Sequence, residues 1–229
     1  MNRARFGLVG LGVAALMLGA AGQRLATQTA APARVALPAP RTDSGVSLEA
    51  AILGRRSVRE FAPTPLTREE IGQLAWAAQG ITDPAGRLRA APSAGGLYPL
   101  ELYLFTPDGL YHYLPEGHAL EVLSDRDLRA ELRAAAQAQA TVSDAPLVVL
   151  ITAVYERTAA RFGEQAERYV HLEAGHVAQN LQLQAVALGL ASVPIGGFSD
   201  AQAAQALSLP EDHRPVYLVA IGHQRSDQG

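Results

Sequence analysis

The feature that most constrains the fold of this chain is residues 169–198, which read YVHLEAGHVAQNLQLQAVALGLASVPIGGF. Apolar residues recur there at steps of three and four, and no proline interrupts them before Pro194. This spacing predicts a long helix over residues 169–188 that buries one side against the rest of the domain. Gly189 follows, and a glycine directly after an apolar helical run is typical of a helix end.

The segment after this helix has the composition of a ligand-binding turn. Residues 191–193 are small or β-branched and predict a short strand. The PIGGF loop (residues 194–198) then contains two adjacent glycines, which leave backbone N–H groups unobstructed by side chains. A flat ligand fits such a place, and the candidate binding residues are Pro194, Ile195, Gly196 and Gly197.

The RRSVREF segment (residues 55–61) is a second candidate binding site. Arg55, Arg56 and Arg59 surround Ser57 within a short stretch of chain. Guanidinium groups bind phosphate in a bidentate manner, and a hydroxyl adds a further donor, so the segment indicates an anion site. A solvated basic turn is the alternative interpretation.

The PSAGG loop (residues 91–99) is the third candidate, because it has too many turn formers for regular structure. Ser93, Ala94 and Gly95 are small enough to let the backbone approach a planar ring. Tyr98, in the same loop, carries a hydroxyl that can donate a proton.

Further elements follow from capping residues, turn signals and apolar runs. The predicted helices cover residues 47–53, 67–80 and 127–140, and the predicted strands cover residues 100–105, 110–114, 146–152 and 215–221. The helix over residues 127–140 is rich in alanine and is expected at the surface.

The N-terminus has the pattern of an export signal. Arg3 and Arg5 precede an uncharged apolar run over residues 6–22, with small residues near its end. Residues 1–22 are therefore expected to be a signal peptide or an uncleaved membrane anchor, and the domain to be exported to the periplasm or the extracellular space. The two arginines are not adjacent, which favours the general secretory route.

Composition sets limits on the remaining chain. Residues 23–44, rich in alanine, threonine and proline, predict a flexible linker, and residues 45–229 have the length of one domain. A net charge of −3 shows no basic excess, so no nucleic-acid partner is expected. The absence of cysteine excludes disulfides and thiolate ligands, and the spacing of His171 and His176 along a helix argues against a shared metal ion.

Together these motifs resemble the FMN-dependent nitroreductase superfamily. The resemblance rests on the three candidate segments, the long helix and PVYLVAIGH at residues 215–223, and EAGHVAQNLQLQAVALGLASVPIGGF is most similar to the SagB-type dehydrogenase branch. It implies an α+β, nitroreductase-like fold, in which helices flank a central, mostly antiparallel sheet and the long helix runs through the middle. It also implies a homodimer with FMN bound at the subunit interface.

The resemblance also implies roles for individual residues. Arg55 and Ser57 would bind the FMN phosphate, and Arg59 would approach the pyrimidine side of the ring, where a guanidinium stabilises the negative charge of the reduced flavin. Gly197 would direct its N–H at flavin N5, and Gly196 stands where many nitroreductases have a glutamate. Further cofactor contacts are implied for Arg56, Ser93, Ala94, Gly95, Pro194, Ile195 and Arg225.

One position differs from the SagB-type pattern in a way that affects mechanism. That branch has a Lys-Tyr pair, tied to azoline dehydrogenation, where this chain has Arg161 and Phe162. Arginine stays protonated and cannot accept a proton as a base, and phenylalanine has no hydroxyl. Arg161 is therefore expected to orient an anionic substrate, and Tyr98 to donate a proton to a substrate being reduced.

These inferences predict an FMN-dependent oxidoreductase that moves two electrons between flavin and a small-molecule or peptide substrate in a ping-pong cycle. A non-enzymatic module that holds flavin, or binds a partner with the same fold, is the alternative, because the Lys-Tyr pair is missing.

Overall fold

The structure, a computed structural model, describes residues 32–225. The predicted export signal at residues 1–22 and the last residues, 226–229, lie outside this range. Within the described residues, no helix is both long enough and apolar enough to cross a membrane.

A seven-stranded sheet, with strand order β1-β4-β3-β2-β5-β7-β6, forms the centre of the described chain. Every pair of neighbouring strands is antiparallel. The strands are β1 (Arg34–Ala36), β2 (Leu100–Thr106), β3 (Gly109–Leu114), β4 (Ala119–Ser124), β5 (Leu147–Ala153), β6 (Ala191–Ile195) and β7 (Arg214–Gly222). The predicted α+β fold is confirmed.

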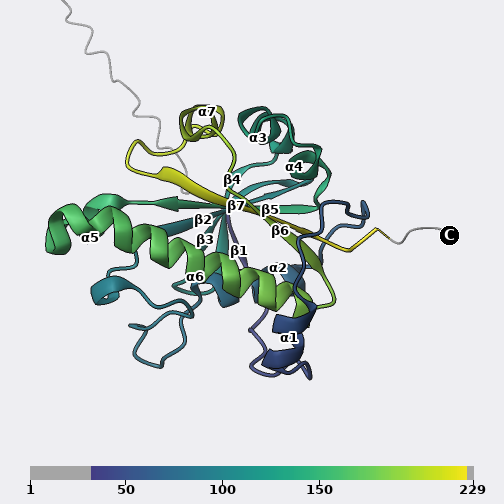
Figure 1. Cartoon of the computed structure of the whole chain (residues 1–229), viewed down its shortest axis with the longest axis horizontal. Coiled ribbons are helices and arrows are strands. Elements are labelled where there is room, and N and C mark those ends of the chain that lie inside the picture. Colours follow the sequence, from purple (N-terminus) through teal and green to yellow (C-terminus); the bar gives the residue numbers. More distant parts are fainter. Residues whose placement is uncertain (1–31, 226–229) are drawn as a thin grey trace, which may run out of the picture. The chain divides into compact units, whose positions relative to one another are not determined.

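Helices cover both faces of this sheet (Figure 1). They are α1 (Leu48–Gly54), α2 (Arg68–Gln79), α3 (Arg129–Ala135), α4 (Ala140–Asp144), α5 (Tyr155–Phe162), α6 (Ala166–Ala187) and α7 (Asp200–Ala206). One core cluster lies between the sheet and α2 with α6, and a second lies between the sheet and α3, α4 and α7. All residues of the central strand β5 are buried, because both of its faces are covered.

The long helix α6 confirms the strongest prediction from the sequence. Its apolar stripe, including Val177 and Leu181, is fully buried against α2 and the sheet. Gly189 has a φ of 72°, and the Leu190 N–H donates to the Ala185 carbonyl over 2.8 Å. This pattern ends a helix with a left-handed residue that favours glycine. It turns the chain back along the sheet into β6 and the PIGGF loop.

The predicted linker is wrong over its last part. Residues 34–36 form β1, which pairs with β4, and Leu37 is 8% exposed within the first core cluster. Arg41 is also tied down, since its N–H donates to Gln73 Oε1 over 2.8 Å. The compact unit therefore begins near Pro32 rather than at residue 45. A three-residue edge strand is too short to show a period of two, so its partner β4 decides its conformation.

The predicted surface helix over residues 127–140 is also wrong. The chain forms two short helices, α3 and α4, because Gln137 and Ala138 adopt positive φ values of 54° and 57° between them. Leu132 and Ala136 are fully buried in the second core cluster. Tertiary contacts thus override the high helix propensity of this alanine-rich run, and the resulting turn places its polar residues beside the PIGGF loop.

Candidate functional site

The RRSVREF segment lies beside the start of β6. Ser57 forms a parallel bridge with Ser192, and the Val58 N–H donates to the Ser192 carbonyl over 3.0 Å. Arg55 is half-buried, and its Nη1 donates to Gln182 Oε1 on α6 over 3.4 Å. Phe61 is only 1% exposed, so it anchors the segment in the second core cluster.

Arg225 lies beside the same segment, although it is far away in sequence. The end of β7 continues along residues 60–62, with the Ala62 N–H donating to the His223 carbonyl over 2.8 Å. The Arg225 N–H donates to the Glu60 carbonyl over 3.3 Å, and its Nη1 lies 4.0 Å from Glu60 Oε2. The fold thus brings Arg225 to the RRSVREF segment, which also carries the two predicted phosphate ligands Arg55 and Ser57.

Arg56 has a different place from its neighbours. Its Nη1 donates to the carbonyls of Leu53 and Arg55, each over 2.8 Å. These bonds direct the guanidinium back onto the C-terminal end of α1, whose last carbonyls need donors. Arg56 therefore caps a helix in this structure rather than joining the predicted anion site.

The PIGGF loop is shorter than the sequence suggested, because Pro194 and Ile195 belong to β6. Gly196 and Gly197 are exposed. The Gly197 carbonyl accepts a hydrogen bond from Gln139 Nε2 over 3.0 Å, whereas its N–H has no acceptor among the described residues. A backbone N–H without an acceptor in the protein is a donor for a ligand atom.

The first turn of α4 links this loop to the RRSVREF segment. Gln139, the residue before α4, holds Gly197, and Thr141 Oγ1 donates to the Arg59 carbonyl over 3.3 Å. Arg59 is exposed, and no acceptor binds its guanidinium within residues 32–225. The start of α4 therefore bonds to the backbone of both the residue with the free N–H and the residue with the free guanidinium.

The PSAGG loop contains a short 3₁₀ turn at Ala94–Gly96. Gly95 has a φ of 64°, and a Cβ atom at this position would lie 2.8 Å from Nη1 of Arg161. Arg161, in the last turn of α5, is thus brought against the loop. Glycine suits this position because the backbone is left-handed, and a larger residue would also require the Arg161 guanidinium to shift.

Tyr98 is held from two sides within this loop. Its N–H donates to Ser93 Oγ over 2.9 Å, and its hydroxyl oxygen accepts from the Arg89 N–H over 3.0 Å. The Arg89 guanidinium lies over the ring, 4.8 Å from its centroid. The phenol is therefore well ordered, and its own proton remains available to another acceptor.

Sequence reasoning missed a polar network behind the PSAGG loop. Arg157 Nη1 contacts the Tyr98 carbonyl over 3.1 Å and Glu101 Oε1 over 2.6 Å, and Glu101 Oε2 lies 2.8 Å from His112 Nε2. Burial raises the pKa of Glu101, but the hydrogen bonds from His112 and Arg157 outweigh it and hold that pKa below its usual range. The sequence feature that could have indicated this network is the alternation of Glu101 and Tyr103 with leucines along β2.

The PSAGG loop and the other two segments contact different parts of α6. The PSAGG loop lies with Tyr169, Glu173 and His176 in the N-terminal half of the helix, whereas Arg55 reaches Gln182 in its C-terminal half. Between residues 32 and 225, no hydrogen bond joins the PSAGG loop to the RRSVREF segment or the PIGGF loop. The structure thus divides the predicted site residues into two groups.

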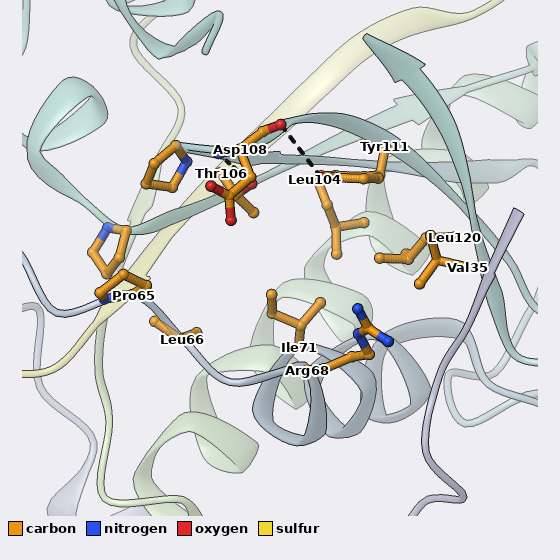
Figure 2. A pocket seen from close by; sticks show the side chains of 12 residues that line it. Val35, Pro65, Leu66, Arg68, Ile71, Leu104, Thr106, Asp108, Tyr111 and Leu120 are labelled. Carbon is orange, nitrogen blue, oxygen red and sulfur yellow. Dashed lines mark hydrogen bonds between the residues drawn. The ribbon is translucent and has the colours of Figure 1, made fainter. Parts of the chain in front are cut away.

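A separate pocket of about 290 Å³ lies between α2 and the sheet (Figure 2). Its floor is apolar, with Ile71 and Leu104 among the lining residues, and Figure 2 shows Arg68 and Asp108 on opposite sides of it. None of the predicted site residues lines this pocket. Over the described part of the chain, no group of three or more histidine or acidic side chains could hold a metal ion.

Comparisons with known proteins identify the family. The sequence profile described as "Nitroreductase family" matches residues 52–223, which is most of the chain. The chain belongs to the nitroreductase family. Members of this family are generally oxidoreductases. The profile includes the RRSVREF segment, both loops and α6, so the residues described above lie inside the family's shared region.

Relatives and solved structures agree with this assignment. A protein of Methanocaldococcus jannaschii, described as a candidate nitroreductase, is 40% identical over 185 residues, which cover 78% of this chain and 92% of that protein. The microcin B17-processing protein McbC of Escherichia coli is 26% identical over 150 residues, covering 61% and 54% of the two chains.

Two structures are similar in fold. A candidate nitroreductase of Ralstonia eutropha has a TM-score of 0.76 and 32% identity, with 84% of this chain and 90% of that chain covered. The NADPH:FMN oxidoreductase of Vibrio harveyi, complexed with NAD+, has a TM-score of 0.59 and 25% identity, with 79% and 70% covered.

Proposed function

We propose that this nitroreductase-family protein is an FMN-dependent oxidoreductase that passes two electrons between the flavin and an organic substrate in a ping-pong cycle. The observation that carries the proposal is the link through the start of α4, where Gln139 and Thr141 donate to the carbonyls of Gly197 and Arg59 and so join the segment with a free guanidinium to the loop with a free N–H. Bound FMN would supply a carrier that accepts and returns two electrons. The V. harveyi neighbour, by its name, uses FMN on a similar fold.

The residues present fit this cofactor. Arg55 and Ser57 supply a guanidinium group and a hydroxyl on the RRSVREF segment, and Arg225 adds a guanidinium beside Glu60 of the same segment, which suits a phosphate. Arg59 would stabilise negative charge on the reduced ring, and the Gly197 N–H would donate to a ring acceptor, with Gln139 bonded to the carbonyl of the same residue.

We further propose a homodimer in which the PSAGG loop of one subunit completes the flavin site of the other. The loop lies apart from the other two segments within one chain, so a single subunit assembles only part of the site. The outer face of α6 is open: Leu172 is 53% exposed, and a Cβ on Gly175 would meet nothing within 4 Å. Neighbouring α1 exposes Leu48, Ile52 and Leu53, and such a patch is typical of an interface. Light scattering of the purified chain tests this proposal, and a monomer would contradict it.

The substrate class follows from Arg161 and Tyr98. Arg161 lies against Gly95, where its permanent charge can orient an anionic group but cannot remove a proton from carbon. Tyr98 is held in the same loop and can donate a proton. Both features favour reduction of a bound acceptor. McbC, by its name, processes a peptide, so a peptide carrying a reducible group is a substrate class to test beside small molecules.

The holoprotein is expected to reduce quinones or nitroaromatics and to leave thiazoline and oxazoline peptides unchanged. Azoline oxidation needs a base beside the carbon that loses a proton, and Arg161-Phe162 supplies none. The visible spectrum of the purified protein first establishes whether flavin is bound. Chemically reduced holoprotein is then mixed with a quinone, and oxidised holoprotein with an azoline peptide, while flavin absorbance is followed.

Free FMN in the same buffer is the control for reaction away from the protein. Rapid flavin reduction by the azoline peptide, with formation of the azole, would show that another residue supplies the base. A protein that binds no flavin would instead favour the non-enzymatic alternative.

We also propose that the domain is exported, on the basis of residues 1–22. A reporter fused to residues 1–44 is expected in the exported fraction. A wholly cytosolic reporter would contradict the proposal.

A further inference from the structure

Glu173 is a buried carboxyl directly beneath the PSAGG loop. It lies on α6, is 2% exposed, and its Oε1 has no hydrogen-bond partner within the described residues. The side chain borders a cavity of about 260 Å³. The other residues that line this cavity are Pro92, Ser93, Ala94, Tyr169, Leu172 and His176. An acidic group is thus placed where burial makes its charge costly.

The groups around this carboxyl come from three elements. Gln79 on α2 has a buried Nε2 without a partner, while its Oε1 accepts from Arg89 Nη1 over 3.3 Å. The PSAGG loop contributes Ser93, and Arg89 stands just before that loop. His176 lies one turn further along α6 and is the other titratable group on the cavity besides Tyr169. Arg161 lies against the loop at Gly95.

These surroundings set the protonation of Glu173. Burial raises the pKa of Glu173 to about 7, and the nearby polar side chains of Ser93 and Gln79, together with the positive charge of Arg89, offset only part of this effect. With the PSAGG loop packed over it, the carboxyl therefore changes charge close to neutral pH.

We propose that Glu173 is a positioning residue that couples the PSAGG loop to pH: the closed loop favours the protonated carboxyl, and loss of the proton favours an open loop that hydrates the carboxylate. The proposal rests on linkage: a conformation that binds a proton more tightly is favoured when that proton is bound. Since the loop is assigned to the flavin, this inference rests on the proposed function.

The amides of Gly96 and Tyr98 report directly on the closed loop. Both N–H groups bond to Ser93, the first to its carbonyl over 3.1 Å and the second to its Oγ over 2.9 Å. Opening the loop breaks these bonds and exposes the amides to exchange with solvent. Protection from hydrogen exchange at these two positions therefore measures the closed fraction.

Hydrogen exchange of the full chain is compared at pH 6 and pH 8.5, after correction for the intrinsic effect of pH on exchange. In the wild type, protection of the two amides is expected to fall by a factor on the order of 10 as pH rises, which is what linkage allows between these two pH values for such a buried acid. Glu173→Gln, which cannot ionise, is expected to keep equal protection at both pH values.

Three variants separate Glu173 from other causes. Glu167→Gln removes an exposed carboxylate of the same helix and should behave as the wild type. His176→Gln tests the histidine that lines the cavity, because histidine is the residue type that commonly changes charge near neutral pH. This variant should keep the pH dependence of the wild type. Ser93→Ala removes the acceptor of the Tyr98 N–H and should lower protection of that amide at both pH values.

A wild-type loop whose protection does not change with pH would overturn the inference. So would an unchanged pH dependence in Glu173→Gln, or loss of that dependence in His176→Gln. FMN titration provides the second readout: affinity should weaken more between pH 6 and 8.5 in the wild type than in Glu173→Gln, since changes in FMN itself affect both equally. If no variant binds FMN, the proposed function fails while the exchange data still test Glu173.

Discussion

Replacing Arg55 or Ser57 by alanine is expected to weaken FMN binding by about 10- to 100-fold in each case, without unfolding the protein. Each loses charge-assisted hydrogen bonds to phosphate, which are worth roughly 1.5–3 kcal/mol apiece, and 1.4 kcal/mol is tenfold in affinity. Stability should change little, because Ser57 is exposed and the bond from Arg55 to Gln182 is long at 3.4 Å. Fluorescence titration with FMN measures the effect.

Arg126→Ala is the matched control, since it removes an exposed guanidinium that pairs with Glu131. Its FMN affinity should equal that of the wild type. Unchanged affinity in both Arg55→Ala and Ser57→Ala would move the anion site elsewhere and return the RRSVREF segment to the alternative of a solvated basic turn.

Glu173→Gln is expected to make the protein more stable than the wild type above pH 7, by on the order of 3 kcal/mol. Folding raises the pKa of Glu173 from 4.5 to about 7, with burial as the largest cause. The folded state therefore binds the proton more tightly than the unfolded state. The stabilisation that this proton gives is complete at pH values below the pKa of the unfolded state. It is lost as pH rises through the pKa of the folded state. Glutamine carries no charge, so the variant lacks this loss.

Chemical denaturation of both proteins without FMN, at pH 5, 7 and 8.5, measures the difference. The gap between the two free energies of unfolding should widen with pH, whereas other titrating groups such as Glu101 affect both proteins alike. A gap that stays constant from pH 5 to 8.5 would show that Glu173 keeps its ordinary ionisation in the folded state. In that case the proposed coupling to the PSAGG loop would lose its basis.

The sequence predicted the elements whose conformation depends on near neighbours. The period of α6 and its end at Gly189 are local, because the helix needs an apolar stripe and a residue that tolerates positive φ. The capping box of Thr67 and Glu70 is local as well, since the two side chains exchange hydrogen bonds across three residues. The motif segments were also visible, because their composition departs from that of ordinary turns.

Tertiary structure decided which of the predicted site residues meet. Arg225 lies beside Glu60 only because β7 runs back along the RRSVREF segment, and Arg56 turns away because the last carbonyls of α1 accept its hydrogen bonds. The Gly197 carbonyl accepts a hydrogen bond from Gln139, which belongs to a run that local propensity assigned to one helix.

The unusual ionisation of Glu173 could not be predicted from the sequence either. The sequence showed a glutamate on a helix, and nothing in its neighbours indicated an unpaired oxygen in a cavity. Helix periodicity and turn chemistry act over a few residues, so a single sequence displays them. Burial, hydrogen-bond partners and the pKa of a carboxyl depend on residues that are distant in sequence, and folding alone brings these together.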